Sequence, residues 1–221
     1  MIKYVYWDVE LEFSRNGTPS SVYGGVSLNP DTIKAYYGDF LQAPDLAEET
    51  AGRTSVEYKS EAEPEGELDV KKEKGVYGFR RDKAGPYIMD FMVKACIKGA
   101  ASVSKLTTQI RGLKNQLSEG LEVAPVEIHF HRNGSVVSRA DGMLEIKGKV
   151  SGPQGSRQIQ TWKEYITGAK VSFSVNYLDT KIITEEVFRD IWEVAQRVGL
   201  GSVRSMDKGK FTVVKLEKRE S

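Results

Sequence analysis

The stretch 199–211 concentrates the residue types best suited to holding an anion. It reads Gly-Leu-Gly-Ser-Val-Arg-Ser-Met-Asp-Lys-Gly-Lys-Phe. Gly199 and Gly201 allow close backbone approach, and exposed amides there can donate hydrogen bonds to phosphate oxygens. The cations of the stretch are Arg204, Lys208 and Lys210. We therefore predict an anion-binding loop, with a helix C-cap followed by a solvated turn as the open alternative.

The same stretch does not match the phosphate-binding loop of nucleotide hydrolases. Its Gly-Lys pair, Gly209-Lys210, lacks a following Ser or Thr. The expected order of elements is helix, loop, strand, whereas loops of that kind run from a strand into a helix. Further cations that can extend an anion-binding track are Arg80, Arg81, Arg132, Arg139 and Arg157.

The two histidines, His129 and His131, are the other candidates for chemistry. Spaced two apart on a predicted strand, they point to the same face and can take part in acid–base catalysis near neutral pH. No Cys pair or carboxylate cluster with metal-ligand spacing accompanies them, so we predict no metal site. A polar sheet face and contact with a nucleic-acid backbone remain as alternatives.

A nucleophilic catalytic centre is not indicated. The single cysteine, Cys96, lies in an apolar helical pattern and is predicted to be part of the core. It also excludes an internal disulfide. We predict no catalytic residue and no cofactor.

Periodicity predicts the elements that must position these residues. Residues 3–13 and 170–178 alternate apolar and polar side chains, which is typical of half-buried strands. Residues 185–198 follow a helical pattern that begins at Thr184, a good N-cap, and ends at Gly199. Further helices are predicted after Asn29, from about residue 87 and from about residue 106, with strands around residues 126–138 and 210–216.

Composition and charge indicate one soluble globular domain spanning residues 1–221. Of the 221 residues, 39% are hydrophobic and 29% are charged. Residues 45–74 carry 5 Lys/Arg against 10 Asp/Glu, and residues 75–221 carry 24 against 16. We therefore predict a flexible acidic insert at about residues 43–74, which offsets a basic body of net charge +8.

The segment order predicts an α+β fold. A strand, a helix, a Gly-rich loop and a closing strand end the chain, and an N-terminal strand and central helix precede them. This order favours a ferredoxin-like or RRM-like core, with an antiparallel sheet, helices on one face and inserted loops. No apolar run is long enough to cross a membrane and the first residues are charged, so a cytoplasmic protein is expected.

The C-terminal unit resembles the ending of RAMP-superfamily proteins, especially the backbone-forming subunits of CRISPR effector complexes. The resemblance rests on residues 170–178, 185–198 and 198–213. The segment that starts Gly85-Pro86-Tyr87-Ile88 also resembles phage and prophage proteins with this ending. The resemblance covers about half of the chain and implies binding of single-stranded nucleic acid, usually RNA, by protomers assembled side by side. In related processing endoribonucleases a histidine commonly acts as the general base.

These observations predict a non-enzymatic protein that binds single-stranded nucleic acid and assembles along it, as a homo-oligomer or within a larger complex. If the protein is phage-encoded, it is expected in the host cytoplasm. One alternative is a structural or assembly protein, of a phage or a complex, without nucleic-acid binding. A minor alternative is a metal-independent endoribonuclease that uses His129 or His131.

Overall fold

The computed structural model describes residues 3–38, 73–152, 155–206 and 208–220. They form a mixed α/β structure with antiparallel sheets, and they divide into two compact units. Unit 1 comprises residues 1–25, 79–142 and 164–221, and unit 2 comprises residues 26–78 and 143–163. The predicted acidic insert lies outside the described residues, except for residues 73 and 74 at the start of a strand.

An antiparallel sheet forms the centre of unit 1. Its strands are β1 (Tyr4–Glu12), β9 (Leu121–Ala124), β15 (Lys170–Leu178) and β16 (Thr212–Lys218). β15 lies between β9 and β1, and β16 pairs with the other side of β1. The short strands β11 (His131–Arg132) and β12 (Ser135–Val136) continue the sheet beside β15. Alternation of buried and exposed residues along β1 and β15 confirms the predicted half-buried strands.

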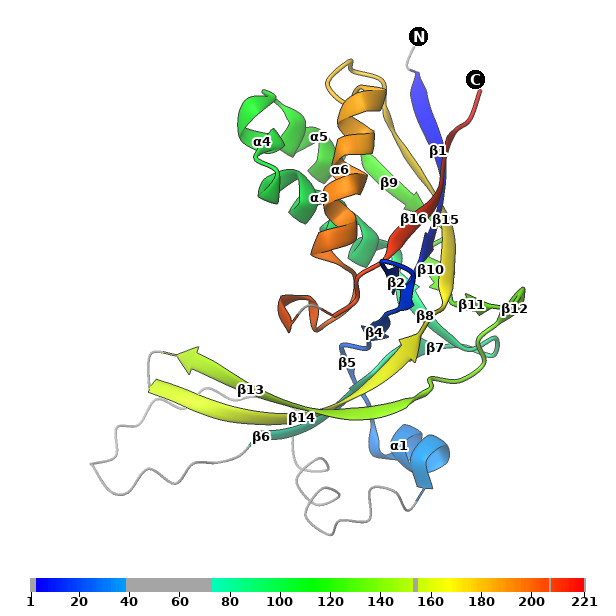
Figure 1. Ribbon diagram of the computed structural model, residues 1–221, viewed down its shortest axis with the longest axis vertical. Helices are drawn as coiled ribbons and strands as arrows, with labels where there is room; N and C mark the ends of the chain where they lie inside the picture. The colour runs from blue at the N-terminus through cyan, green and yellow to red at the C-terminus, as the bar shows by residue number, and fades with distance from the viewer. Residues whose placement is uncertain (1–2, 39–72, 153–154, 207, 221) are drawn as a thin grey trace. The chain divides into compact units, whose positions relative to one another are not determined.

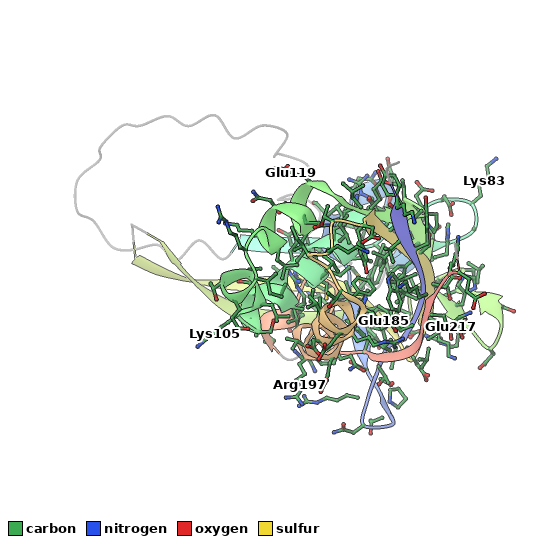
Figure 2. All side chains as sticks on the ribbon, turned by 90° about the horizontal axis from the view of Figure 1, so that it is seen from above. Lys83, Lys105, Glu119, Glu185, Arg197 and Glu217 are labelled. Atoms are coloured by element: carbon green, nitrogen blue, oxygen red, sulfur yellow. The ribbon has the colours of Figure 1, made fainter. Side chains whose placement is uncertain are left out.

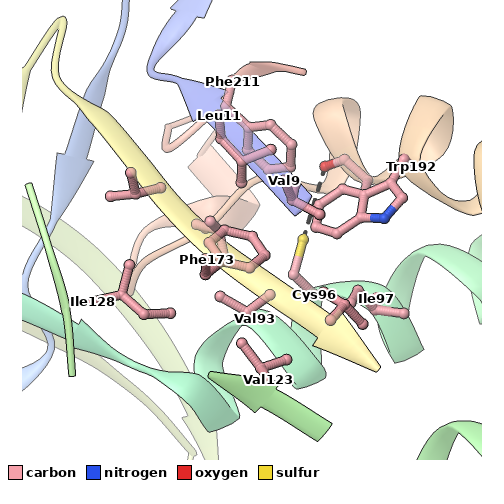
Figure 3. Close-up of a cluster of buried hydrophobic side chains, with 14 of the residues drawn as sticks. Val9, Leu11, Val93, Cys96, Ile97, Val123, Ile128, Phe173, Trp192 and Phe211 are labelled. Atoms are coloured by element: carbon pink, nitrogen blue, oxygen red, sulfur yellow. Dashed lines mark hydrogen bonds between the residues drawn. The ribbon is translucent and has the colours of Figure 1, made fainter. Parts of the chain in front are cut away.

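Two long helices, α3 (Asp90–Val103) and α6 (Glu185–Val198), cover one face of this sheet (Figure 1). The hydroxyl of Thr184 accepts a hydrogen bond from the Val187 amide, which confirms the predicted N-cap. Figure 3 shows how Cys96 on α3 and Trp192 on α6 meet Phe173 of the sheet in the core. Burial raises the pKa of the Cys96 thiol to about 12, so this thiol is a core group and not a nucleophile.

The start of the central helix differs from the prediction. Residues Pro86–Met89 form strand β8, and α3 begins only at Asp90. β8 pairs with β7 (Arg80–Arg81) on one side and with β10 (Glu127–His129) on the other. A second difference lies after α3, where one predicted helix is split into α4 (Leu106–Gln109) and α5 (Leu113–Glu119). Gly112, with φ of +85°, lies between them and starts a new helix direction.

Unit 2 is built on a ribbon formed by β13 (Gly142–Gly152) and β14 (Gly155–Thr167). β6 (Glu73–Gly78) pairs with β14 in parallel, and β5 (Val26–Ser27) pairs with β6. The glycine- and proline-containing sequence of residues 151–157 is typical of a loop, but residues 151–152 and 155–157 are strand backbone. Helix α1 (Pro30–Tyr37) begins as predicted at Asn29, whose side chain accepts a hydrogen bond from the Thr32 amide at 2.7 Å.

The end of β14 belongs to unit 1, where β4 (Ser21–Tyr23) pairs with its residues 165–167. A turn at Asn16 and Gly17, both with positive φ, joins β2 (Ser14–Arg15) to β3 (Thr18–Pro19). None of the helices in the described ranges is both long and apolar enough to span a lipid bilayer.

Candidate nucleic-acid interface

An open groove of about 970 Å³ lies between α3 and α6 and reaches the loop that follows α6. The α3 wall contains Ala95, Gly99 and Val103, which are spaced four apart and so share one helix face. A Cβ atom built on Gly99 would lie 3.7 Å from Cγ1 of Val198 on α6. The helices therefore pack closely at Gly99, and the groove opens along their exposed edges.

The loop end of the groove contains part of the predicted anion-binding loop. Gly201, Arg204 and Lys210 line the groove, together with Arg197 from the last turn of α6. Arg204 lies in the short 3-10 helix η2 (Arg204–Met206) and is half-buried. Lys208 is exposed on the same loop but does not line the groove. The structure thus brings two of the three predicted loop cations to one surface.

The loop glycines pack against the protein. Gly201, with φ of +91°, has its Cβ position 2.8 Å from the Tyr23 carbonyl oxygen. The amides of Leu200 and Ser202 donate to the carbonyls of Gly209 and Tyr23, at 2.8 and 3.1 Å. These two amides are therefore engaged within the fold and are not offered to an anion.

The cations at this end also lie near helix C-termini. Lys210 Nζ donates to the carbonyl of Arg197, in the last turn of α6. Carbonyls at a helix C-terminus are left without intrahelical partners and carry partial negative charge, so this contact stabilises α6. Figure 2 shows Arg197 and Lys105, just beyond the end of α3, pointing outward. The helix C-cap, which was the alternative interpretation of this stretch, is present at Gly199. Arg197 and Arg204, on either side of it in the sequence, provide cations in addition to it.

The remaining predicted cations of unit 1 do not line the groove, and they differ in their surroundings. Arg81 donates to the fully buried carboxylate of Glu164 at 2.6 Å. Arg132 makes a bidentate pair with Asp141, at 3.0 and 2.7 Å, and also donates to the Thr167 carbonyl. Arg80 and Arg139 are exposed. Arg157 belongs to β14, and the structure describes its backbone position only.

The histidines separate on neighbouring strands. His129 Nε2 lies 3.0 Å from Oδ1 of Asp82, and this contact holds the pKa of the Asp82 carboxyl below its usual value. His129 and Arg80 are each in register with Tyr87, so they flank it in one row across three strands. His131 lies on β11 instead, where it is in register with Lys170 of β15 and Val136 of β12. Among the described residues, no group of three or more His, Cys, Asp or Glu side chains is placed to hold a metal ion.

Sequence reasoning missed the α6 side of the groove. Glu193 and Arg197 lie four residues apart on the exposed face of α6, where charges are normally solvated. Nothing in that pattern distinguishes a groove wall from an ordinary solvent-facing stripe. The stripe becomes one wall of the groove because α3, which is distant in sequence, packs beside α6.

The sequence matches no protein-family model and no curated protein. Among solved structures, the chain is similar to a chain in the cryo-EM structure of the Type III-B Cmr-beta bound to cognate target RNA. The TM-score is 0.46 and the sequence identity is 12%. The match covers 99% of this chain and 61% of that chain, so this chain spans less than two thirds of its length. A likeness at this level does not assign a function.

Proposed function

We propose that this protein binds single-stranded nucleic acid, with RNA as the expected form, in the groove between α3 and α6. The observation that supports the proposal is the gathering of Arg197, Arg204 and Lys210 along one groove of about 970 Å³. Cationic side chains that line a groove neutralise successive phosphates and release counterions, which supplies most of the affinity for a nucleic-acid backbone.

The apolar walls of the groove suit unpaired bases. Val103, Val194 and Val198 line it, and Val103 is 69% exposed. A surface with cations beside apolar side chains holds phosphates and base faces together, as single-strand binding requires. A small anion would need the cations only and would leave these apolar side chains without a role.

The proposal extends to the fold and to the assembly. The order β1, α3, β9, β15, α6, β16 and the sheet order β9–β15–β1–β16 support a ferredoxin-like core in unit 1. We further propose that protomers bind side by side along the nucleic-acid strand. A structural or assembly protein without nucleic-acid binding is the competing function, and it predicts self-association that nucleic acid does not change.

The direct test is fluorescence anisotropy of labelled single-stranded RNA and DNA, each about 30 nucleotides long. The test variant is Arg197→Ala/Arg204→Ala, which removes the two groove arginines and leaves the Lys210 contact with α6 in place. We expect its affinity to fall roughly tenfold or more, which corresponds to about 1.4 kcal/mol. A matched control, Lys114→Ala/Lys170→Ala, removes the same charge outside the groove and should bind nearly as the parent does.

Two results would contradict the proposal. One is no binding of either strand at low salt. The other is an equal loss of affinity in the test and control variants, because that would show only an effect of net charge.

A second function, metal-independent RNA cleavage, is favoured by one observation: the hydrogen bond between His129 and Asp82. An ionised carboxylate can only accept, so Nε2 donates in this contact, and in a neutral imidazole Nδ1 is then the acceptor. Asp82 Oδ1 also accepts from the amides of Ala84 and Gly85, at 2.8 and 3.1 Å, which fixes its position. Arg80, in the same row, offers a cation for a phosphate.

This second function predicts cleavage of labelled RNA in the presence of a chelator. His129→Ala should abolish the cleavage, while His131→Ala, the neighbouring histidine outside the row, should preserve it. A strand with 2′-deoxyribose throughout should be resistant. If the parent protein leaves RNA intact, or if the two variants cleave equally, the function does not reside in this row.

A further inference from the structure

Glu193 is the one carboxylate among the described residues that line the groove between α3 and α6. It is exposed, and within the described chain its carboxylate forms no ion pair with the groove cations. A carboxylate beside a path for phosphates repels them, which weakens simple backbone binding. Its place in the groove therefore points to a different contact, one that needs an acceptor.

The bases of a single strand provide donors for such an acceptor. Unpaired bases are commonly read along their Watson–Crick edges, and a carboxylate is an acceptor only. Guanine presents two adjacent donors there, N1–H and the N2 amino group, which match both carboxylate oxygens. Adenine and cytosine present one amino donor next to a ring nitrogen that repels a carboxylate. Uracil presents one N–H between two carbonyl oxygens.

The neighbours of Glu193 are suited to the rest of a nucleotide. Arg197 lies four residues further along α6, a separation of roughly 6 Å at the usual helical rise. Val194, from the same helix, and Val103, from α3, provide apolar surface for a base face. A cation for the phosphate, an apolar wall and an acceptor thus lie together.

We propose that Glu193 gives the groove a preference for guanine in single-stranded nucleic acid. The inference rests on the proposed function, because it concerns the same groove. Glu193 accepts from N1–H and N2–H of one guanine, while Arg197 and Arg204 contact phosphates. The carboxylate lowers general affinity for a strand and raises affinity for strands that carry a guanine.

The test compares 30-nucleotide uridine strands that carry a few separated guanines, adenines, cytosines or inosines. Isolated guanines keep the strands unstructured, and inosine lacks the N2 amino group. We expect the parent protein to bind the guanine strand roughly tenfold more tightly than the uridine strand, the discrimination typical of one bidentate contact. Inosine should lose most of this gain.

Glu193→Gln should remove the preference, because an amide cannot accept from both donors. It should bind the uridine strand at least as tightly as the parent does. The matched control is Glu186→Gln, which removes an exposed carboxylate from the first turn of the same helix. That variant should keep the preference for guanine.

The outcomes separate the two claims. If the parent binds all strands equally, or if Glu193→Gln retains the guanine preference, the role of Glu193 is overturned and the binding function stands. If the parent binds no strand at low salt, the proposed function itself is overturned.

Discussion

The arginines of this protein have different roles, and the groups that each one contacts indicate its role. Arg81 has its side chain 12% exposed, and it contacts a Glu164 side chain that is fully buried. Glu164 also accepts from the Phe79 amide at 2.9 Å. Arg81 and the Phe79 amide thus provide hydrogen-bond donors for both oxygens of the buried Glu164 carboxylate. Arg81 is therefore first a structural residue, although the sequence presents it beside the equally basic Arg80.

Arg81→Ala is expected to destabilise the protein by about 3 kcal/mol, because it leaves the buried Glu164 carboxylate without its cation. The matched control is Arg80→Ala, which removes the neighbouring exposed guanidinium and should change stability by less than about 0.5 kcal/mol. Urea denaturation of both variants measures the difference. Equal stability of the two variants would contradict the role given to the pair.

Among the elements, the loop after α6 depends most on its glycines. Gly209 has φ of +71°, and a Cβ atom there would overlap the carbonyl oxygen of Leu200. Its amide donates to the Ser21 carbonyl at 2.9 Å, which ties the loop to β4. The loop therefore holds Arg204 and Lys210 at the groove through a fixed backbone path.

Gly209→Ala should lower the free energy of unfolding by about 2 kcal/mol or more, because left-handed backbone strain adds to the overlap with Leu200. Gly134 provides the control, since its φ is +79° and its Cβ position contacts nothing within 4 Å. Gly134→Ala should cost about 1 kcal/mol, the strain alone. Chemical denaturation measures the free energy of unfolding of both variants. An equal loss in the two would contradict the prediction, because the overlap with Leu200 would then add no cost.

Long periodic elements of this chain are predictable from its sequence, and short ones are not. β1, β15 and α6 were expected nearly within their observed bounds because each repeats its pattern over nine or more residues. Pro86–Met89 is a short apolar run, which fits a strand and a helix equally well. The ribbon β13–β14 was not predicted, because glycines and a proline interrupt the alternating pattern of the sequence between residues 148 and 155.

The candidate site was predictable only where one segment contains it. Arg204 and Lys210 lie close in sequence and were expected together. Arg132 is neutralised by Asp141, and Arg81 by Glu164, which is 83 residues away in sequence. Such pairing depends on tertiary structure, and it cannot be read from the local pattern of charge.

Across the whole molecule, the distribution of charge matters more than the net charge of +1. On the face of the central sheet opposite α3 and α6, Asp8 pairs with Arg219 and Glu10 with Lys170. These pairs neutralise that face. The groove between the helices instead gathers Arg197, Arg204 and Lys210, and among the described residues that line it Glu193 is the one carboxylate. A phosphate backbone is therefore expected to follow the groove and not the helix-free face.

The most direct test of this account is the salt dependence of binding to a labelled single-stranded RNA, measured for the parent protein and for Arg197→Ala/Arg204→Ala. Each neutralised phosphate contributes about −0.7 to the slope of log affinity against log salt for a single strand. The account predicts salt-sensitive binding by the parent and a slope shallower by about 1.4 in the variant. An identical slope in both proteins, or no binding at low salt, would contradict it.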